Sequence, residues 1–194
     1  MAEAINPEKV VVLYNTAVPD SKKLAEFYRD ARAIPNGNLI GLDMPVTPDI
    51  SRADYDAKIL KPLRSEFDSR GWWSRQKDAM GILQPTSNDM KVLVLMRGVP
   101  LRIQPAPLPE GKKVAPNDPI GGRNEASVDS ELALFRVEGL PAEGVLKNVF
   151  YQSTQSISSS RFPFLILTAR IDAPSTATCQ RMITDALAAE KHGL

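Results

Sequence analysis

The segment Lys91–Ile103, KVLVLMRGVPLRI, constrains the fold more than any other part of the chain. Five consecutive apolar residues in it are followed at once by an arginine, a glycine and a proline. A short apolar run closed by turn residues is typical of a strand buried on both faces, as in the middle of a parallel sheet. We therefore expect a parallel sheet with this strand near its centre. Ligands bind beyond the carboxyl ends of such strands, where Arg97 and Gly98 follow here.

Apolar runs and helical periodicity alternate along the rest of the chain. The other predicted strands are Lys9–Asn15, Asn38–Asp43 and Phe164–Thr168. The predicted helices lie within Ser21–Ala33, Ser51–Phe67, Ser127–Phe135 and Ser175–Leu187, and Pro62 makes the second one either a bent helix or two short ones. This order predicts an α/β fold, a three-layer α/β/α sandwich with a mainly parallel sheet.

The length and composition of the chain indicate one globular domain. The 194 residues fit a single α/β domain, with long loops expected at 104–126 and 137–161. A formal net charge of +1 gives no electrostatic case for nucleic acid, and no apolar run is long enough for a membrane span. The first residues do not form a signal peptide. The chain is therefore either cytoplasmic or an exported protein whose signal is absent.

Common catalytic and cofactor arrangements are missing from the sequence. The single histidine, His192, lies near the end of the chain, and the single cysteine, Cys179, lies on the apolar face of the last predicted helix. We interpret Cys179 as a buried core thiol, and we expect neither a nucleophile–base pair nor a metal site. The turn after the first strand lacks a phosphate-binding glycine loop, so no cofactor is expected. Trp72 and Trp73 either cover the core or stack on a ligand.

Polar residues at the predicted strand ends form the candidate ligand site. We expect them to converge at the carboxyl edge of the sheet, where arginine can hold a carboxylate or phosphate with two hydrogen bonds. The main candidates are Arg97, Gly98, Arg102, Asp129, Glu131, Arg170 and Asp172, and the secondary candidates are Asn15 and Asp43. The alternative is a structural cluster in which the carboxylates only neutralise the arginines.

Several sequence blocks resemble an uncharacterised bacterial family across nearly the whole chain. They include GVPLR at Gly98–Arg102, SVDSEL at Ser127–Leu132 and ARIDAP at Ala169–Pro174. Members of that family commonly have Lys-Gly-Val-Pro and Arg-Leu-Asp-Gly-Pro, whereas this chain has Arg97 before Gly98 and Ala173 before Pro174. The resemblance implies no assigned activity. It implies an exported or periplasmic protein, and a longer native chain of which these residues are the N-terminal half.

The helix that contains Asp129, the following strand with Arg170, and the last helix up to Glu190 are distantly similar to the early part of gingipain-type peptidases. That resemblance implies a caspase-like sheet, with a flavodoxin-like sheet as the alternative. In those peptidases the catalytic histidine and cysteine come later in the chain. Two functions stay open. The chain is the non-catalytic half of a larger caspase-like hydrolase or of a relative that lost catalysis, or it is a module that binds a small anion or carbohydrate at the strand ends.

Overall fold

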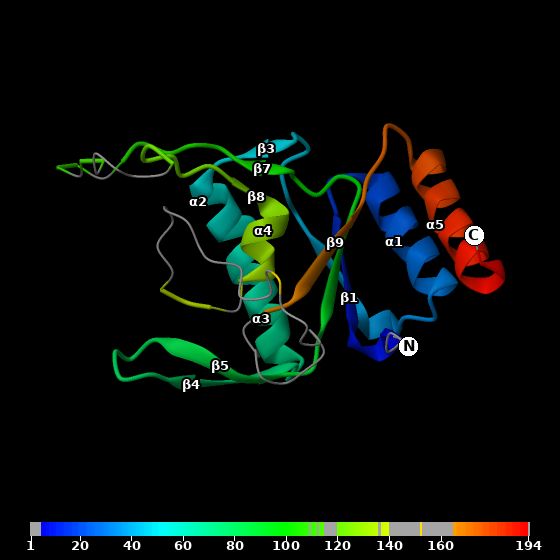
Figure 1. Ribbon diagram of the computed structural model, residues 1–194, viewed down its shortest axis with the longest axis horizontal. Helices are drawn as coiled ribbons and strands as arrows, with labels where there is room; N and C mark the ends of the chain where they lie inside the picture. Colours follow the sequence, from blue (N-terminus) through cyan, green and yellow to red (C-terminus); the bar gives the residue numbers. More distant parts are fainter. Residues whose placement is uncertain are drawn as a thin grey trace.

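A four-stranded parallel sheet forms the centre of the protein (Figure 1). The computed structural model describes residues 5–108, 110, 111, 113, 114, 120–135, 137–139, 152 and 165–193. The sheet has the order β2-β1-β6-β9, with bounds Leu39–Leu42, Val10–Asn15, Val92–Met96 and Leu167–Ile171. All five residues of β6 are buried, and β6 lies between β1 and β9. The prediction of a parallel sheet with this strand in its interior is confirmed.

Helices pack on both faces of this sheet because the strand residues alternate between two cores. On one face Val12 and Val94 pack with α1 (Pro19–Ala31) and α5 (Thr176–His192). On the other face Leu13 and Leu95 pack with α2, α3 and α4. These helices are Arg52–Tyr55, Lys61–Ser69 and Val128–Ala133.

Pro62 does not break the second helical segment. A π-helical turn, Asp56–Leu60, joins α2 to α3 and accommodates the proline, which cannot donate a backbone hydrogen bond. At the start of α2 the Ser51 hydroxyl accepts a hydrogen bond from the Asp54 N–H at 3.0 Å. Ser175 caps α5 in the same way through the Thr178 N–H at 3.1 Å. None of the helices in the described ranges has the length and hydrophobicity needed to cross a bilayer.

The predicted strand Phe164–Thr168 needs correction. Phe164 lies outside the described residues, and the strand that pairs with β6 is β9, three residues further along the chain than expected. β9 forms an edge of the sheet and is only partly buried, so it tolerates Ala169 and Arg170 inside the strand. The most apolar stretch of sequence in this region therefore does not mark the position of β9.

Two small sheets flank the main one, and the sequence does not predict either. β3 (Asp49–Ile50), β7 (Arg102–Ile103) and β8 (Ala126–Ser127) lie near the carboxyl ends of the central strands (Figure 1). β4 (Trp73–Lys77) and β5 (Leu83–Asn88) form an antiparallel hairpin. Of the two predicted long loops, 104–126 starts directly after β7 and ends at the first residue of β8, and the structure describes it in part. Most of the second, 137–161, lies outside the described residues.

An aromatic cluster fixes the base of the β4–β5 hairpin. The Trp73 ring stacks on Phe135 and meets Phe67 edge to face, with ring centroids 5.8 and 5.4 Å apart. The Arg75 guanidinium lies over the Trp73 ring and pairs with Asp68 at 2.6 Å. Trp73 therefore covers the core, which is the first of the two alternatives for the tryptophan pair.

Candidate functional site

The four parallel strands end at one edge of the sheet, at the top of Figure 1. The loops that leave this edge begin after Asn15, Leu42, Met96 and Ile171. α1 and α5 begin close together at the same edge, where the Thr176 hydroxyl donates to Asp20 at 3.3 Å. Ligands in open parallel sheets collect at this position.

Arg170 and Asp129 form a bidentate ion pair at this edge. Arg170 Nε donates to Asp129 Oδ1 at 3.0 Å, and Nη2 donates to Oδ2 at 2.8 Å. Nη1 donates to the Val99 carbonyl at 2.8 Å, and Nη2 also donates to the Pro100 carbonyl at 3.0 Å. These bonds use every nitrogen of the guanidinium. We call this arrangement the Arg170 clasp, because it joins β9, α4 and the loop after β6.

The position of Arg170 differs from the sequence prediction. We expect it after the last predicted strand, Phe164–Thr168, but it is the fourth residue of β9 and pairs in register with Leu95. Its side chain is 15% exposed. Asp172, the first residue beyond β9, lies 3.9 Å from Arg170 Nη1 and is a distant second carboxylate partner. The clasp thus matches the structural alternative more closely than an open ligand site.

Arg97 is held differently. Its Nε donates to the Ala173 carbonyl at 3.0 Å and its Nη2 donates to the Pro174 carbonyl at 3.4 Å. Among the described residues no carboxylate lies within 4.0 Å of this guanidinium, so its charge is not neutralised by an ion pair there. Nη1 and one N–H of Nη2 make no hydrogen bond to the described residues. Arg97 is therefore a cation anchored by two backbone carbonyls.

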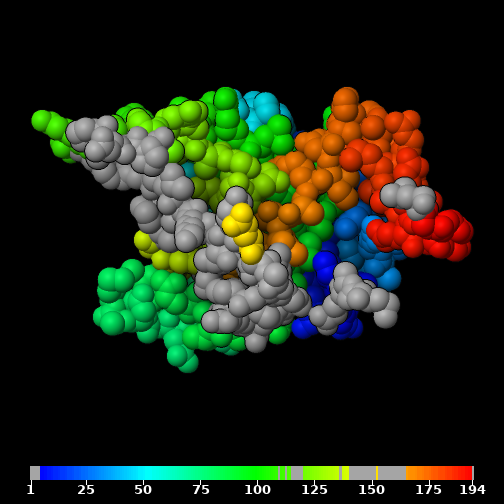
Figure 2. All heavy atoms as spheres, viewed as in Figure 1, coloured from blue at the N-terminus to red at the C-terminus, as the bar shows by residue number. Residues whose placement is uncertain are grey.

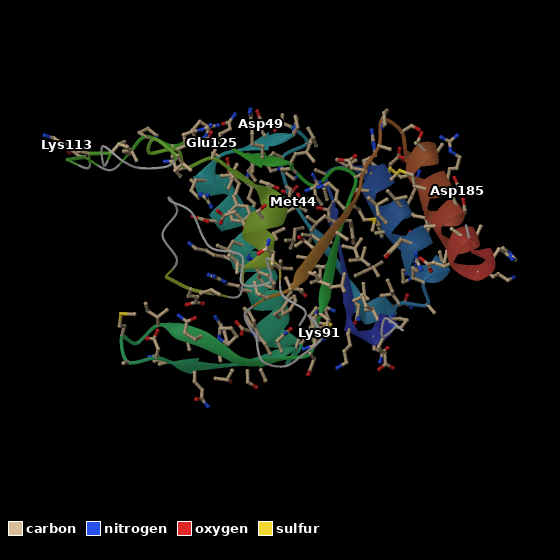
Figure 3. All side chains as sticks on the ribbon, viewed as in Figure 1. Met44, Asp49, Lys91, Lys113, Glu125 and Asp185 are labelled. Carbon is tan, nitrogen blue, oxygen red and sulfur yellow. The ribbon has the colours of Figure 1, made fainter. Side chains whose placement is uncertain are left out.

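Asn15 and Gly98 have structural roles in positioning the strand-end loops. The buried Asn15 amide donates to the carbonyls of Gly98 at 2.8 Å and Pro45 at 3.1 Å. Its Oδ1 accepts from the N–H groups of Ala17 and Met44, the latter labelled in Figure 3. Gly98 has φ +98°, and a Cβ there would lie 3.2 Å from Val18. Asn15 thus ties three loops together, and all its polar atoms are satisfied.

Two candidate residues belong to separate ion pairs. Arg102 on β7 makes a bidentate pair with Asp49, labelled in Figure 3, with nitrogen–oxygen distances of 3.0 and 2.7 Å. Hydrogen bonding to Arg102 lowers the pKa of Asp49. Glu131 pairs instead with Arg52 at 3.1 Å, which links α4 to α2. Arg102 and Glu131 thus pair with Asp49 and Arg52, which lie outside the candidate set.

The remaining residues considered from the sequence are Asp43 and Cys179. Asp43 is exposed on the loop after β2. Cys179 is a buried core residue in the first turn of α5, as the sequence predicts. Burial raises the pKa of its thiol, Asp172 raises it further, and Arg97 opposes both. In the part of the chain that the structure describes, no three histidine, cysteine or acidic side chains are grouped so as to hold a metal ion.

The groups that orient Arg97 and Arg170 could not be predicted from the sequence. The carbonyls of Ala173 and Pro174 orient Arg97, and the carbonyls of Val99 and Pro100 hold Arg170. Backbone acceptors carry no signature in a single sequence. Gly98 and the prolines at positions 100 and 174 signal the turns themselves, but not which carbonyls accept hydrogen bonds.

No protein-family model, curated protein or solved structure matches this chain.

Proposed function

We propose that this chain is a binding module that holds a small anion at the carboxyl edge of its sheet, with Arg97 as the contacting residue. The observation that carries this proposal is the anchored Arg97 guanidinium without a carboxylate partner among the described residues. Its unused N–H groups form a planar edge, and such an edge matches two oxygens of a carboxylate or phosphate. The other arginines of the candidate set are occupied by Asp129 and Asp49.

The two carbonyls that anchor Arg97 also support binding. A free arginine loses side-chain entropy when it grips a ligand, and that loss weakens affinity. The bonds to Ala173 and Pro174 already restrict this side chain. The Arg97 guanidinium is therefore already oriented before a ligand binds. Sugar hydroxyls can accept from the same groups, so carbohydrates are a weaker alternative ligand class.

Replacing Arg97 with alanine is expected to abolish ligand binding with little loss of stability. Ligand binding to the folded state raises the melting temperature, so thermal shifts measure it. We expect phosphate, sulfate or a small carboxylate to raise the melting temperature of the wild type and not of Arg97→Ala. Arg181→Ala, which removes an exposed arginine of α5, is the matched control and should respond like the wild type. The proposal fails if none of these ligands shifts the wild type, or if Arg97→Ala shifts equally.

For the fold, we propose a three-layer α/β/α sandwich of flavodoxin-like or caspase-like type. The order β2-β1-β6-β9 supports this, because the parallel strands, numbered along the chain, follow the order 2-1-3-4. A flavodoxin-like sheet has the order 2-1-3-4-5. Helices against both faces of the sheet agree with three layers.

A second candidate function is the non-catalytic half of a larger caspase-like hydrolase, or of a relative that lost catalysis. Its support is the element order α4, β9, α5, which carries the resemblance to gingipain-type peptidases. The gene sequence beyond the codon for Leu194 tests it. A histidine and a cysteine at later strand ends would favour the hydrolase, and a stop codon there would favour the binding module.

A further inference from the structure

Arg97 and Asp172 follow two neighbouring strands at the carboxyl edge of the sheet. The last register pair between β6 and β9 joins Met96 to Ile171. Arg97 is the residue after Met96, and Asp172 is the residue after Ile171. Neighbouring strands lie about 4.8 Å apart, so the two strand ends place a cation and an anion at adjacent backbone positions.

These two charged side chains are held by other groups and do not form an ion pair with each other. The carbonyls of Ala173 and Pro174 hold the Arg97 guanidinium. The Asp172 carboxylate lies 3.9 Å from Arg170 Nη1, and that nitrogen already donates to a backbone carbonyl. Within the described residues Asp172 accepts no hydrogen bond. The edge therefore presents a guanidinium and a carboxylate that each lack a charged hydrogen-bond partner in this part of the chain.

The buried Cys179 thiol lies near both charges. Burial raises the pKa of this thiol, Asp172 raises it further, and Arg97 lowers it. Coulomb interactions weaken with distance, so both side chains lie close to this one sulfur. The electrostatics therefore agree with the register of the strands in placing Arg97 beside Asp172.

Both groups lie at the surface of the molecule. The Asp172 side chain is 30% exposed, and the contact of Arg97 Nη2 with Pro174 is exposed as well. Pro174 and Ser175, in the turn that leads into α5, are exposed residues. Figure 2 shows the orange segment between β9 and α5 protruding at the top of the view. A small ligand in solution can therefore reach this turn.

We propose that the ligand of the Arg97 site is a free α-amino acid, whose carboxylate binds Arg97 and whose ammonium group binds Asp172. This inference rests on the anion site proposed above and names the class of its ligand. An α-amino acid carries its two charged groups on one carbon, and Arg97 and Asp172 come from adjacent strand ends. Both contacts are charge-assisted hydrogen bonds, which are stronger than neutral ones.

The charge balance of this edge favours a zwitterion over a simple anion. Arg170 is paired with Asp129, and Arg97 balances the charge of Asp172, so the four side chains together are neutral. A bound amino acid is neutral overall and leaves this balance unchanged. A phosphate or a simple carboxylate adds negative charge beside Asp172, and like charges repel each other.

Isothermal titration calorimetry of the wild type with L-alanine, propionate and ethylamine tests the ligand class. Propionate lacks the ammonium group of L-alanine, and ethylamine lacks its carboxylate. We expect L-alanine to bind more tightly than either, by about tenfold or more over propionate, because only L-alanine contacts both side chains. If propionate or ethylamine binds as tightly as L-alanine, the zwitterion is overturned, and binding of propionate alone still supports the anion site. If neither L-alanine nor propionate binds, both proposals fail.

Asp172→Asn tests the residue that binds the ammonium group. The substitution keeps the shape of the side chain and removes its charge. We expect the affinity for L-alanine to fall by about tenfold or more, while propionate binds at least as tightly as to the wild type. Asp43→Asn, which removes an exposed carboxylate from the same edge, is the matched control and should keep the preference for L-alanine. A folded Asp172→Asn variant that keeps this preference would overturn the assignment, and the ligand series in the wild type needs no variant to fold.

Discussion

Replacing Arg170 with alanine is expected to lower the free energy of unfolding by about 3 kcal/mol or more. The substitution leaves the Asp129 carboxylate, which is 27% exposed, without its bidentate partner. It also removes the donors to the carbonyls of Val99 and Pro100. An uncompensated, largely buried charge accounts for most of the expected loss.

Urea unfolding followed by circular dichroism measures this change. Arg102→Ala is the control, because it also removes an arginine from a bidentate pair with an aspartate. The Arg102 side chain is 60% exposed, and exposed pairs contribute little, so its unfolding curve should stay close to that of the wild type. Equal effects of the two substitutions would show that the Arg170 clasp is not a structural element.

Replacing Asn15 with alanine is the second large effect, with an expected loss of about 3 kcal/mol in the free energy of unfolding. The Asn15 side chain is fully buried and makes four hydrogen bonds to backbone groups of three loops. Alanine leaves the carbonyls of Pro45 and Gly98 and the N–H groups of Ala17 and Met44 without these partners. Buried polar groups that lose their partners are costly.

The same unfolding experiment measures Asn15→Ala. The matched control is Asn36→Ala, since Asn36 is an exposed asparagine whose side chain has no hydrogen bond to the described residues. We expect the control to change stability little. A loss for Asn15→Ala no larger than for Asn36→Ala would mean that solvent reaches the strand-end loops freely.

The central sheet could be predicted because its interior strands are short and strongly apolar. β1 and β6 lie within a residue of their predicted bounds. The bounds of β9 were predicted less accurately. An edge strand is half exposed, so the most apolar residues nearby need not belong to it. The β4–β5 hairpin could not be predicted either. Its strands WSRQK and LQPTSN are polar, and contacts of Arg75 with Trp73 and Asp68 hold its base.

For the candidate site, the sequence brought Arg170 together with Asp129, but it did not predict the partners of Arg102 and Glu131. Arg97 and Arg170 both lie at the carboxyl edge, where strand pattern alone places them. Which carboxylate each arginine meets depends on tertiary packing. Arg102 meets Asp49 from β3, and Glu131 meets Arg52 from α2, across 53 and 79 residues of sequence. No pattern in a single sequence specifies such partners.

The central claim is that Arg97, and not Arg170 or Arg102, is the cation available to an anion at the sheet edge. Nitrogen-15 NMR of the arginine side chains tests it directly, by following the guanidinium signals during titration with phosphate or a small carboxylate. The account predicts saturable shifts of the Arg97 signals, with those of Arg170 and Arg102 unchanged. Saturable shifts of Arg170 without shifts of Arg97, or no saturable shift of any arginine, would contradict it.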